Sequence, residues 1–195
     1  TDPFADVKRR QNEHVLDLYG DLRAQVENSP DPLLTALKFS VAGNIIDLGA
    51  QSSYNLADAL AQCLKNDFAI NDYSAFREEL SRSHSLLYIL DNAGEIVFDK
   101  LLIEEIRKTA RPPKITCVVR KHPILNDVTR DDASFIGLPE YCEVIDAGAD
   151  VFGIPLRDCS QEFRDRFYAT DMVVSKGMAN FETLENADRD VFFVL

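Results

Sequence analysis

The DNAGE segment at residues 91–95 carries the side chains of this sequence that are best suited to chemistry. It follows five consecutive apolar residues at 86–90, which predict a buried strand, and an apolar stripe of helical period begins directly after it. Open α/β sheets bind their ligands at such a joint, beyond the carboxyl end of a strand. Asp91 and Asn92 would offer a divalent cation the oxygen ligands that it prefers.

Polar side chains follow the next predicted strands in the same way. The apolar run at 115–119 is followed by Arg120, Lys121, His122, Asn126 and Asp127, and the run at 144–145 is followed by Asp146. The run at 172–174 is followed by Ser175, Lys176, Gly177 and Asn180. Because the carboxyl ends of parallel strands meet at one sheet edge, we expect these residues to lie near Asp91. Two carboxylates and a carboxamide beside a lysine are a donor set for a metal ion that bridges to a phosphate. The ion would polarise the phosphoryl oxygens while Lys176 neutralises their charge.

Each of these residues also has a simpler interpretation that the sequence leaves open. Asp91 and Asn92 could serve only as caps of the helix that follows them. The pair at 126–127 could form a plain turn before a helix, and Lys176 could be a surface lysine. A single cap needs only one such residue, so the excess of acid at a buried strand end favours a metal site.

The first part of the chain is helical by pattern. The predicted helices are one amphipathic helix over 4–27, one from Asp31-Pro32 to about Gly43, one over 56–65 capped by Asn55, and one from Asn71 or Asp72 to near Ser81. From residue 84 on, short apolar runs alternate with helical stretches, and the spacing of the first four runs suits right-handed βαβ crossovers. We therefore predict an α/β fold, with a Rossmann-like, mostly parallel sheet and flanking helices at 84–195 after an all-helical subdomain at 1–83.

The composition excludes several classes of partner. The formal charge is -12, whereas nucleic acids and anionic membranes select basic surfaces. No apolar run is long enough to span a bilayer, and the chain begins with no signal-peptide pattern. The four cysteines show no paired spacing, so we expect reduced thiols in a cytoplasmic protein. The first residue is Thr and the last apolar run, at 191–195, looks like a core strand, so we expect a chain truncated at both ends.

Three ordered motifs resemble those of the metal-dependent damage-control phosphatases, a family long catalogued as domain of unknown function 89. They are DNAGEIVFD at 91–99, PILNDVT at 123–129 and SKGMANFETL at 175–184, and GNIID at 43–47 also matches the family pattern. The likeness covers nearly the whole chain, and the chain looks most like the compact prokaryotic, largely archaeal subgroup. Members of that subgroup usually open with a Cys-x-x-Cys segment and continue to a lysine implicated in phosphate binding, and this sequence contains neither segment.

The resemblance implies a site and a reaction. Asp91, Asn92 and Asp127 would hold a divalent metal ion, with Mn, Co, Ni and Mg all compatible, and Asp91 and Asp127 are the candidate catalytic residues. The residues that would contact the substrate are Lys176, Gly177, Asn180, Glu95, Asn44 and Asp47. The family hydrolyses small phosphate monoesters, often damaged or surplus phosphorylated metabolites such as sugar phosphates.

Other mechanisms and functions stay open at this point. Asp91 could attack phosphorus itself, although the missing Asp-x-Asp signature of haloacid-dehalogenase phosphatases favours attack by metal-activated water. An S-adenosylmethionine-dependent carboxyl methyltransferase, an activity ascribed to a distant branch of the family, would need a glycine-rich turn, and only Ala93-Gly94 follows the first strand. A non-catalytic module would bind phosphorylated metabolites without turnover. The sequence identifies neither the physiological substrate nor the oligomeric state.

Overall fold

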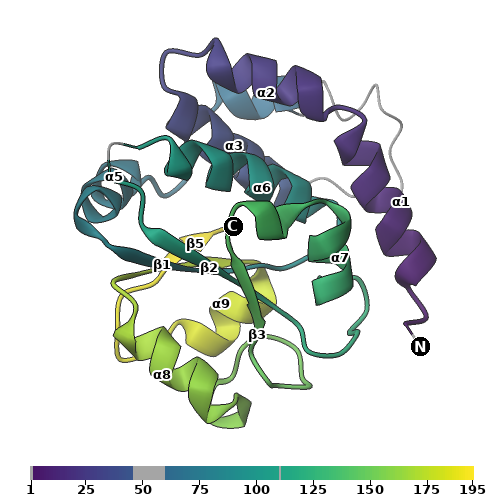
Figure 1. The fold of residues 1–195 in the computed structure, drawn as a ribbon. Helices are drawn as coiled ribbons and strands as arrows, with labels where there is room; N and C mark the ends of the chain where they lie inside the picture. The colour runs from purple at the N-terminus through teal and green to yellow at the C-terminus, as the bar shows by residue number, and fades with distance from the viewer. Residues whose placement is uncertain (1, 46–59, 110) are drawn as a thin grey trace.

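A five-stranded parallel sheet forms the centre of the protein (Figure 1). The computed structural model describes residues 2–45, 60–109 and 111–195. Its strands are β1 (Ser85–Ile89), β2 (Lys114–Val119), β3 (Glu143–Asp146), β4 (Met172–Lys176) and β5 (Phe192–Val194). Their order is β3-β2-β1-β4-β5, and every neighbouring pair is parallel. The predicted α/β fold with a parallel sheet is therefore confirmed, and each predicted apolar run coincides with a strand.

Helices cover both faces of the sheet. The helices are α1 (Ala5–Leu16), α2 (Tyr19–Glu27), α3 (Pro32–Ile45), α5 (Tyr73–Arg82), α6 (Glu95–Arg107), α7 (Arg130–Phe135), α8 (Gln161–Ala169) and α9 (Met178–Leu184), with 3₁₀ turns at Leu138–Glu140 and Leu156–Asp158. Figure 1 shows α3 and α6 on one face of the sheet and α8 and α9 on the other. The arrangement is a three-layer sandwich with the sheet in the middle.

The central strand β1 contributes side chains to two separate hydrophobic cores. Leu86 and Tyr88 pack with α3 and α6, whereas Leu87 and Ile89 pack with α8 and α9. Successive side chains of a strand point to opposite faces, so a strand buried on both faces must be apolar throughout. This requirement explains the unbroken apolar run before the DNAGE segment.

The prediction of a single amphipathic helix over 4–27 is wrong, because the chain bends between α1 and α2. The turn at residues 17–18 tightens, with the Leu18 amide donating to the Val15 carbonyl three residues back at 3.1 Å. The bend lets α2 pack along α3 while α1 packs against α6 and α7. It also changes the buried face of α1, on which Lys8 and Asn12 lie in the protein and Phe4 and Val7 are 37% exposed.

The other helix starts follow their predicted caps. The Asp31 carboxylate accepts a hydrogen bond from the Leu34 amide at 3.2 Å, and Asn71 accepts from the Tyr73 amide at 3.1 Å. Residues 60–65 are helical, but the predicted cap at Asn55 lies outside the described residues. The change from helices to alternating strands falls between α5 and β1, and the division into two domains there stays a prediction. No helix in the described parts of the chain has the length and apolarity to cross a membrane.

Candidate functional site

Backbone hydrogen bonds hold the turn after β1 against the loop after β2. The Ala93 amide donates to the Asn126 carbonyl, and the Val128 amide donates to the Asp91 carbonyl, both at 2.9 Å. Between these bonds Asn92 and Asp127 form an isolated antiparallel bridge. Two motifs that are far apart in the sequence are therefore fixed side by side at the carboxyl edge of the sheet.

The side chains of the DNAGE segment bond to one another rather than to the following helix. The Asn92 amide nitrogen donates to Asp91 Oδ2 at 2.8 Å and to Glu95 Oε1 at 3.0 Å. The N-cap of α6 is Gly94, and no side chain among the described residues caps this helix. The alternative that Asp91 and Asn92 serve only as helix caps is therefore wrong. Because the Asn92 nitrogen is used by the carboxylates, its carbonyl oxygen is left for another ligand.

Asp127 is held by a buried arginine at the end of β2. Arg120 Nε donates to Asp127 Oδ2 at 2.6 Å, and the remaining nitrogens of Arg120 donate to the Gly153 carbonyl and, at 3.0 Å, to Asn180 Oδ1. Arg120 is only 3% exposed. The arginine uses one oxygen of Asp127, so the second oxygen is left for a cation. The helix α7 is capped instead by Thr129 and Asp132, so Asp127 is not part of a plain helix start.

The site carries an excess of negative charge. Burial, together with the charges of Glu95 and Asp127, raises the pKa of Asp91 to about 7 against the opposing effect of Lys176 and Arg120. Burial also raises the pKa of Glu95, whose Oε2 has no hydrogen-bond partner among the described residues. A divalent cation would offset this charge and use oxygen donors of the kind present here. No three His, Cys, Asp or Glu side chains in the described ranges form a metal-binding group. The candidate oxygen donors at this edge are the carboxylates of Asp91 and Asp127 and the amide oxygen of Asn92.

The end of β4 lies directly behind Asp91. Lys176 is fully buried, and its ammonium donates to the Ser40 carbonyl. The same ammonium nitrogen lies 3.5 Å from Asp99 Oδ1 and 3.9 Å from Glu95 Oε2. A Cβ atom on the next residue, Gly177, would meet Asp91 Oδ2 at 2.1 Å. Only glycine therefore allows the backbone to approach the Asp91 carboxylate this closely.

Asn180 ties α9 to the same edge of the sheet. Its Nδ2 donates to the Lys176 carbonyl at 2.7 Å and to the Leu90 carbonyl at 3.2 Å, and its Oδ1 accepts from Arg120. These bonds place Asn180 behind the site, where it connects three of its elements. Its predicted contact with substrate stays a prediction.

Two polar residues of α1, which sequence reasoning missed, contact both motifs from outside. Lys8 Nζ donates to Asp132 Oδ2 at 2.7 Å and to the Asp127 carbonyl at 3.4 Å. Asn12 Oδ1 accepts from the Gly94 amide at 2.6 Å. Lys8 and Asn12 are 1% and 0% exposed, one helical turn apart on one face. Lys8, Asn12 and the buried Val15 follow one another at intervals of four and three residues, and this helical spacing is the signal that could have placed them on one buried face.

The remaining candidates lie further out or are not described. Lys121 and His122 are exposed, and Asp146 pairs with Arg130 at 3.0 Å. Asp47 lies outside the described residues, and Asn44 lies in the last turn of α3, where only its backbone is described. The residue before Asn44, Gly43, packs against the start of α6, since a Cβ there would lie 3.5 Å from the Glu95 Cα.

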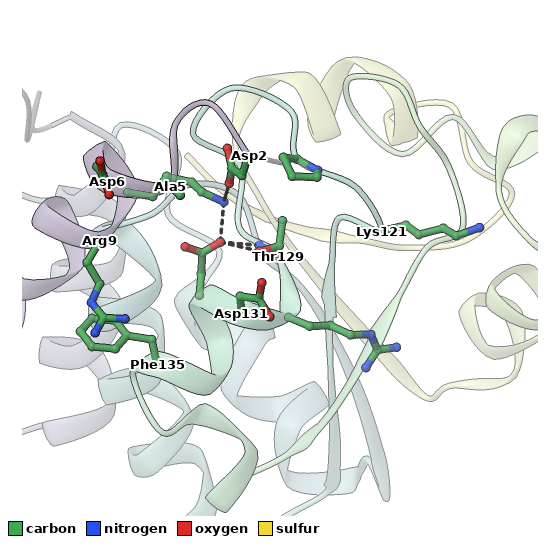
Figure 2. Close-up of a pocket in the computed structure, with 12 residues that line it drawn as sticks. Asp2, Ala5, Asp6, Arg9, Lys121, Thr129, Asp131 and Phe135 are labelled. Atoms are coloured by element: carbon green, nitrogen blue, oxygen red, sulfur yellow. Dashed lines mark hydrogen bonds and ion pairs between the residues drawn. The ribbon is translucent and has the colours of Figure 1, made fainter.

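A pocket of about 620 Å³ opens between α1 and the segment 121–135 (Figure 2). Figure 2 shows Asp2 and Arg9 on the side of α1, and Thr129 and Phe135 on the other side. The Arg9 guanidinium lies over the Phe135 ring, 3.5 Å from its centroid. The pocket lining includes Pro123 and Thr129, on either side of Asp127 in the chain, but none of the candidate metal ligands, and its size suits a small molecule.

Comparison with known proteins gives consistent matches along the entire chain. The family model for the damage-control phosphatase ARMT1-like domain matches residues 1–195. An uncharacterized protein of Methanocaldococcus jannaschii is 35% identical over 204 residues, and the proteins of Pyrococcus horikoshii and Archaeoglobus fulgidus named damage-control phosphatase are 33% and 36% identical over 196 and 200 residues. These matches cover 100% of this chain but 66%, 67% and 68% of the relatives, so the chain spans about two thirds of their length.

A solved structure also matches the chain. The crystal structure of a DUF89 family protein from Pyrococcus horikoshii matches with a TM-score of 0.89 at 32% identity, over 98% of this chain and 67% of that one. The sequence motifs, the parallel sheet and the whole-chain match of the family model thus lead to one conclusion. The chain belongs to the damage-control phosphatase ARMT1-like domain family.

Proposed function

We propose that this protein is a phosphatase that uses a divalent metal ion to hydrolyse small phosphate monoesters, with sugar phosphates as the first class to test. The observation that carries the proposal is the meeting of Asp91, Asn92 and Asp127 at one sheet edge, with more negative charge than the local cations offset. Two relatives named damage-control phosphatase support the reaction class. Mn, Co, Ni and Mg all suit the oxygen donors.

The proposed metal ligands are the carboxylates of Asp91 and Asp127 and the carbonyl oxygen of Asn92. When bound, the ion would polarise the phosphoryl group and lower the pKa of a water, which we propose as the nucleophile. Arg120 keeps the Asp127 carboxylate in one orientation through its 2.6 Å hydrogen bond. Asn92 bridges Asp91 and Glu95 by donating to both carboxylates.

The proposed substrate side of the site is formed by Lys176, Gly177, Asn180 and Glu95, together with Asn44 and Asp47. Lys176 supplies positive charge behind Glu95, at 3.9 Å, and so favours an anionic phosphate over a neutral ligand. The pocket beside α1 has the volume to accept the organic part of a small metabolite.

The proposal is tested with the full-length protein and p-nitrophenyl phosphate. The enzyme is stripped of metal with EDTA and assayed after addition of Mn, Co, Ni or Mg. We expect activity to require metal, and to fall at least about 100-fold in Asp91→Asn and Asp127→Asn, because each removes an ionised ligand. Asp67→Asn is the matched control, since Asp67 is exposed and far along the chain from these motifs.

Three outcomes separate the alternatives. Hydrolysis that survives both chelation and the Asp91→Asn substitution would exclude the proposed mechanism. Tight binding of phosphate esters without hydrolysis, at every metal tested, would identify a binding module instead. Calorimetric titration with S-adenosylmethionine covers the methyltransferase alternative, and we expect no heat of binding.

A further inference from the structure

Two thiols face each other between β2 and the segment that leads into β3. Cys117 lies in β2, and Cys142 directly precedes β3, which pairs with β2 in parallel. Their Sγ atoms are 3.2 Å apart in a thiol–thiol hydrogen bond, and both cysteines are free. A disulfide bond is about 2.05 Å long, so its formation needs the two sulfur atoms to approach by only about 1 Å.

The two thiols differ in their access to solvent. Cys117 is fully buried, in the hydrophobic core between the sheet and α6. Cys142 is half-buried and lines a pocket of about 490 Å³, together with Arg107 and Lys114. A small molecule in this pocket can therefore reach Cys142, whereas Cys117 has no exposed surface.

The electrostatic environment also shifts the pKa values of the two thiols in opposite directions. The hydrogen bond between the two thiols lowers the pKa of the Cys142 thiol, and Arg107 lowers it further. Burial raises the pKa of Cys117 well above its ordinary value. The thiolate is the nucleophilic form of cysteine, so Cys142 is suited to react first and Cys117 to react second.

We propose that Cys142 and Cys117 form an intramolecular disulfide when the protein meets a peroxide. The Cys142 thiolate attacks the O–O bond of hydrogen peroxide, which gives a sulfenic acid and, after protonation, one water. The Cys117 sulfur then attacks the Cys142 sulfur, and the hydroxyl group leaves with the Cys117 proton as a second water. The two sulfur atoms are oxidised by two electrons in total, and the two peroxide oxygens are reduced. This modification site is independent of the proposed phosphatase activity.

The two other cysteines serve as internal controls. Cys159 is buried, its sulfur bonds to the Pro155 carbonyl at 3.4 Å, and burial raises its pKa to about 11. Cys63 is half-buried, and burial raises its pKa as well. Neither has a second thiol as a hydrogen-bond partner within the described residues. We therefore expect both to stay reduced under conditions that oxidise Cys142.

Peptide mapping of the full-length protein after peroxide treatment tests the proposal. Remaining thiols are alkylated in denaturant, the protein is digested with trypsin, and the digest is compared with and without dithiothreitol. We expect residues 115–120 to be linked to residues 131–157, with a mass about 2 Da below the sum of the two peptides, the mass of two hydrogen atoms. The oxidised protein should also melt several degrees higher, because the link closes a loop that is open in the reduced unfolded chain.

Two substitutions test whether the link depends on Cys142. Cys142→Ser should abolish the link and leave Cys117 alkylatable, whereas Cys159→Ser should leave the link unchanged. Recovery of residues 115–120 and 131–157 as separate alkylated peptides after peroxide treatment of the wild type would overturn the proposal. A link from Cys142 to Cys63 or to a second chain would overturn it equally, and these wild-type readings hold even where a variant folds poorly.

Discussion

Arg120 fixes the Asp127 carboxylate to the sheet through a 2.6 Å hydrogen bond from Nε to Oδ2. The same guanidinium donates to the Gly153 carbonyl and to Asn180 Oδ1, so three separate segments depend on one buried side chain. A ligand that is oriented by such a partner binds its metal more tightly than a mobile one. Arg120 is thus a positioning residue for the proposed metal site.

Arg120→Met should weaken metal binding and stability together. Losing the orientation of Asp127 is expected to reduce Mn²⁺ affinity about 10- to 100-fold, measured by calorimetric titration of the EDTA-stripped protein. Leaving the buried Asp127 without its cation should lower the free energy of unfolding by roughly 3 kcal/mol, measured by urea denaturation. Arg157→Met is the control, since Arg157 is exposed and its one ion pair within the described residues is with the neighbouring Asp158. Wild-type Mn²⁺ affinity in a folded Arg120→Met variant would exclude the positioning role.

Gly177→Ala should disrupt the site from behind. The new Cβ would meet Asp91 Oδ2 at 2.1 Å, and the backbone φ of +83° is strained for any other residue. We expect Mn²⁺ binding to be lost and the free energy of unfolding to fall by at least about 2 kcal/mol. Gly20→Ala is the matched control, because a Cβ there meets nothing within 4 Å and alanine favours the helix α2. Equal Mn²⁺ binding by the two variants would contradict the close approach of Gly177 to Asp91.

The stability of the metal-free protein should depend on the charge of Asp91. Burial raises its pKa to about 7, above the value of about 3.9 in an unfolded chain. Between these two values the folded protein keeps a proton that the unfolded chain has released, so the free energy of unfolding falls as the pH rises through this window. The expected decrease from pH 5 to pH 8 in EDTA is a few kcal/mol, measured by urea denaturation.

Asp91→Asn removes the titrating group and should flatten this decrease, whereas Asp188→Asn, at an exposed position, should not. Excess Mn²⁺ should stabilise the wild type more at pH 8 than at pH 5, because the ion binds the ionised carboxylate. The same pH dependence in Asp91→Asn and wild type would show that another group causes it. Glu95, whose pKa burial also raises, would then be the next residue to test.

The elements of the sheet could be predicted because their physical requirements are local. A strand covered on both faces must be apolar throughout, and a strand end that binds ligands must turn polar, so residues 86–95 contain both signals. The orientation of Arg120 could not be predicted in this way. Its partners Gly153 and Asn180 lie 33 and 60 residues away, and only the folded sheet brings them together.

The polar residues on α1 were missed for a related reason. Counting apolar residues assigns Phe4 and Val7 to the buried face, yet both are 37% exposed, and Lys8 and Asn12 are buried in their place. A buried lysine is stable only where a carboxylate and a carbonyl meet it, and those groups come from the segment 127–132. The spacing along α1 places Lys8 and Asn12 on one face with Val15, but it does not identify the partners that allow them to be buried.

Lys8→Met should therefore destabilise the protein and loosen the Asp127 loop. Lys8 is 1% exposed and bonds to Asp132 Oδ2 at 2.7 Å, so its loss leaves a buried carboxylate without its cation. We expect the free energy of unfolding to fall by roughly 3 kcal/mol, measured by urea denaturation. Arg10→Met, at an exposed position on the same helix, should change it by less than about 0.5 kcal/mol.

A double variant shows whether the stability lost in Lys8→Met comes from the uncompensated charge of Asp132 or from lost packing around Lys8. Lys8→Met with Asp132→Asn removes the uncompensated carboxylate, and the asparagine oxygen can still accept from the Thr129 amide that Asp132 now binds at 2.8 Å. We therefore expect the double variant to regain about half of the lost stability while its Mn²⁺ affinity stays low, because the Asp127 carbonyl still lacks its donor. If the double variant is less stable than Lys8→Met alone, packing rather than charge explains the buried lysine.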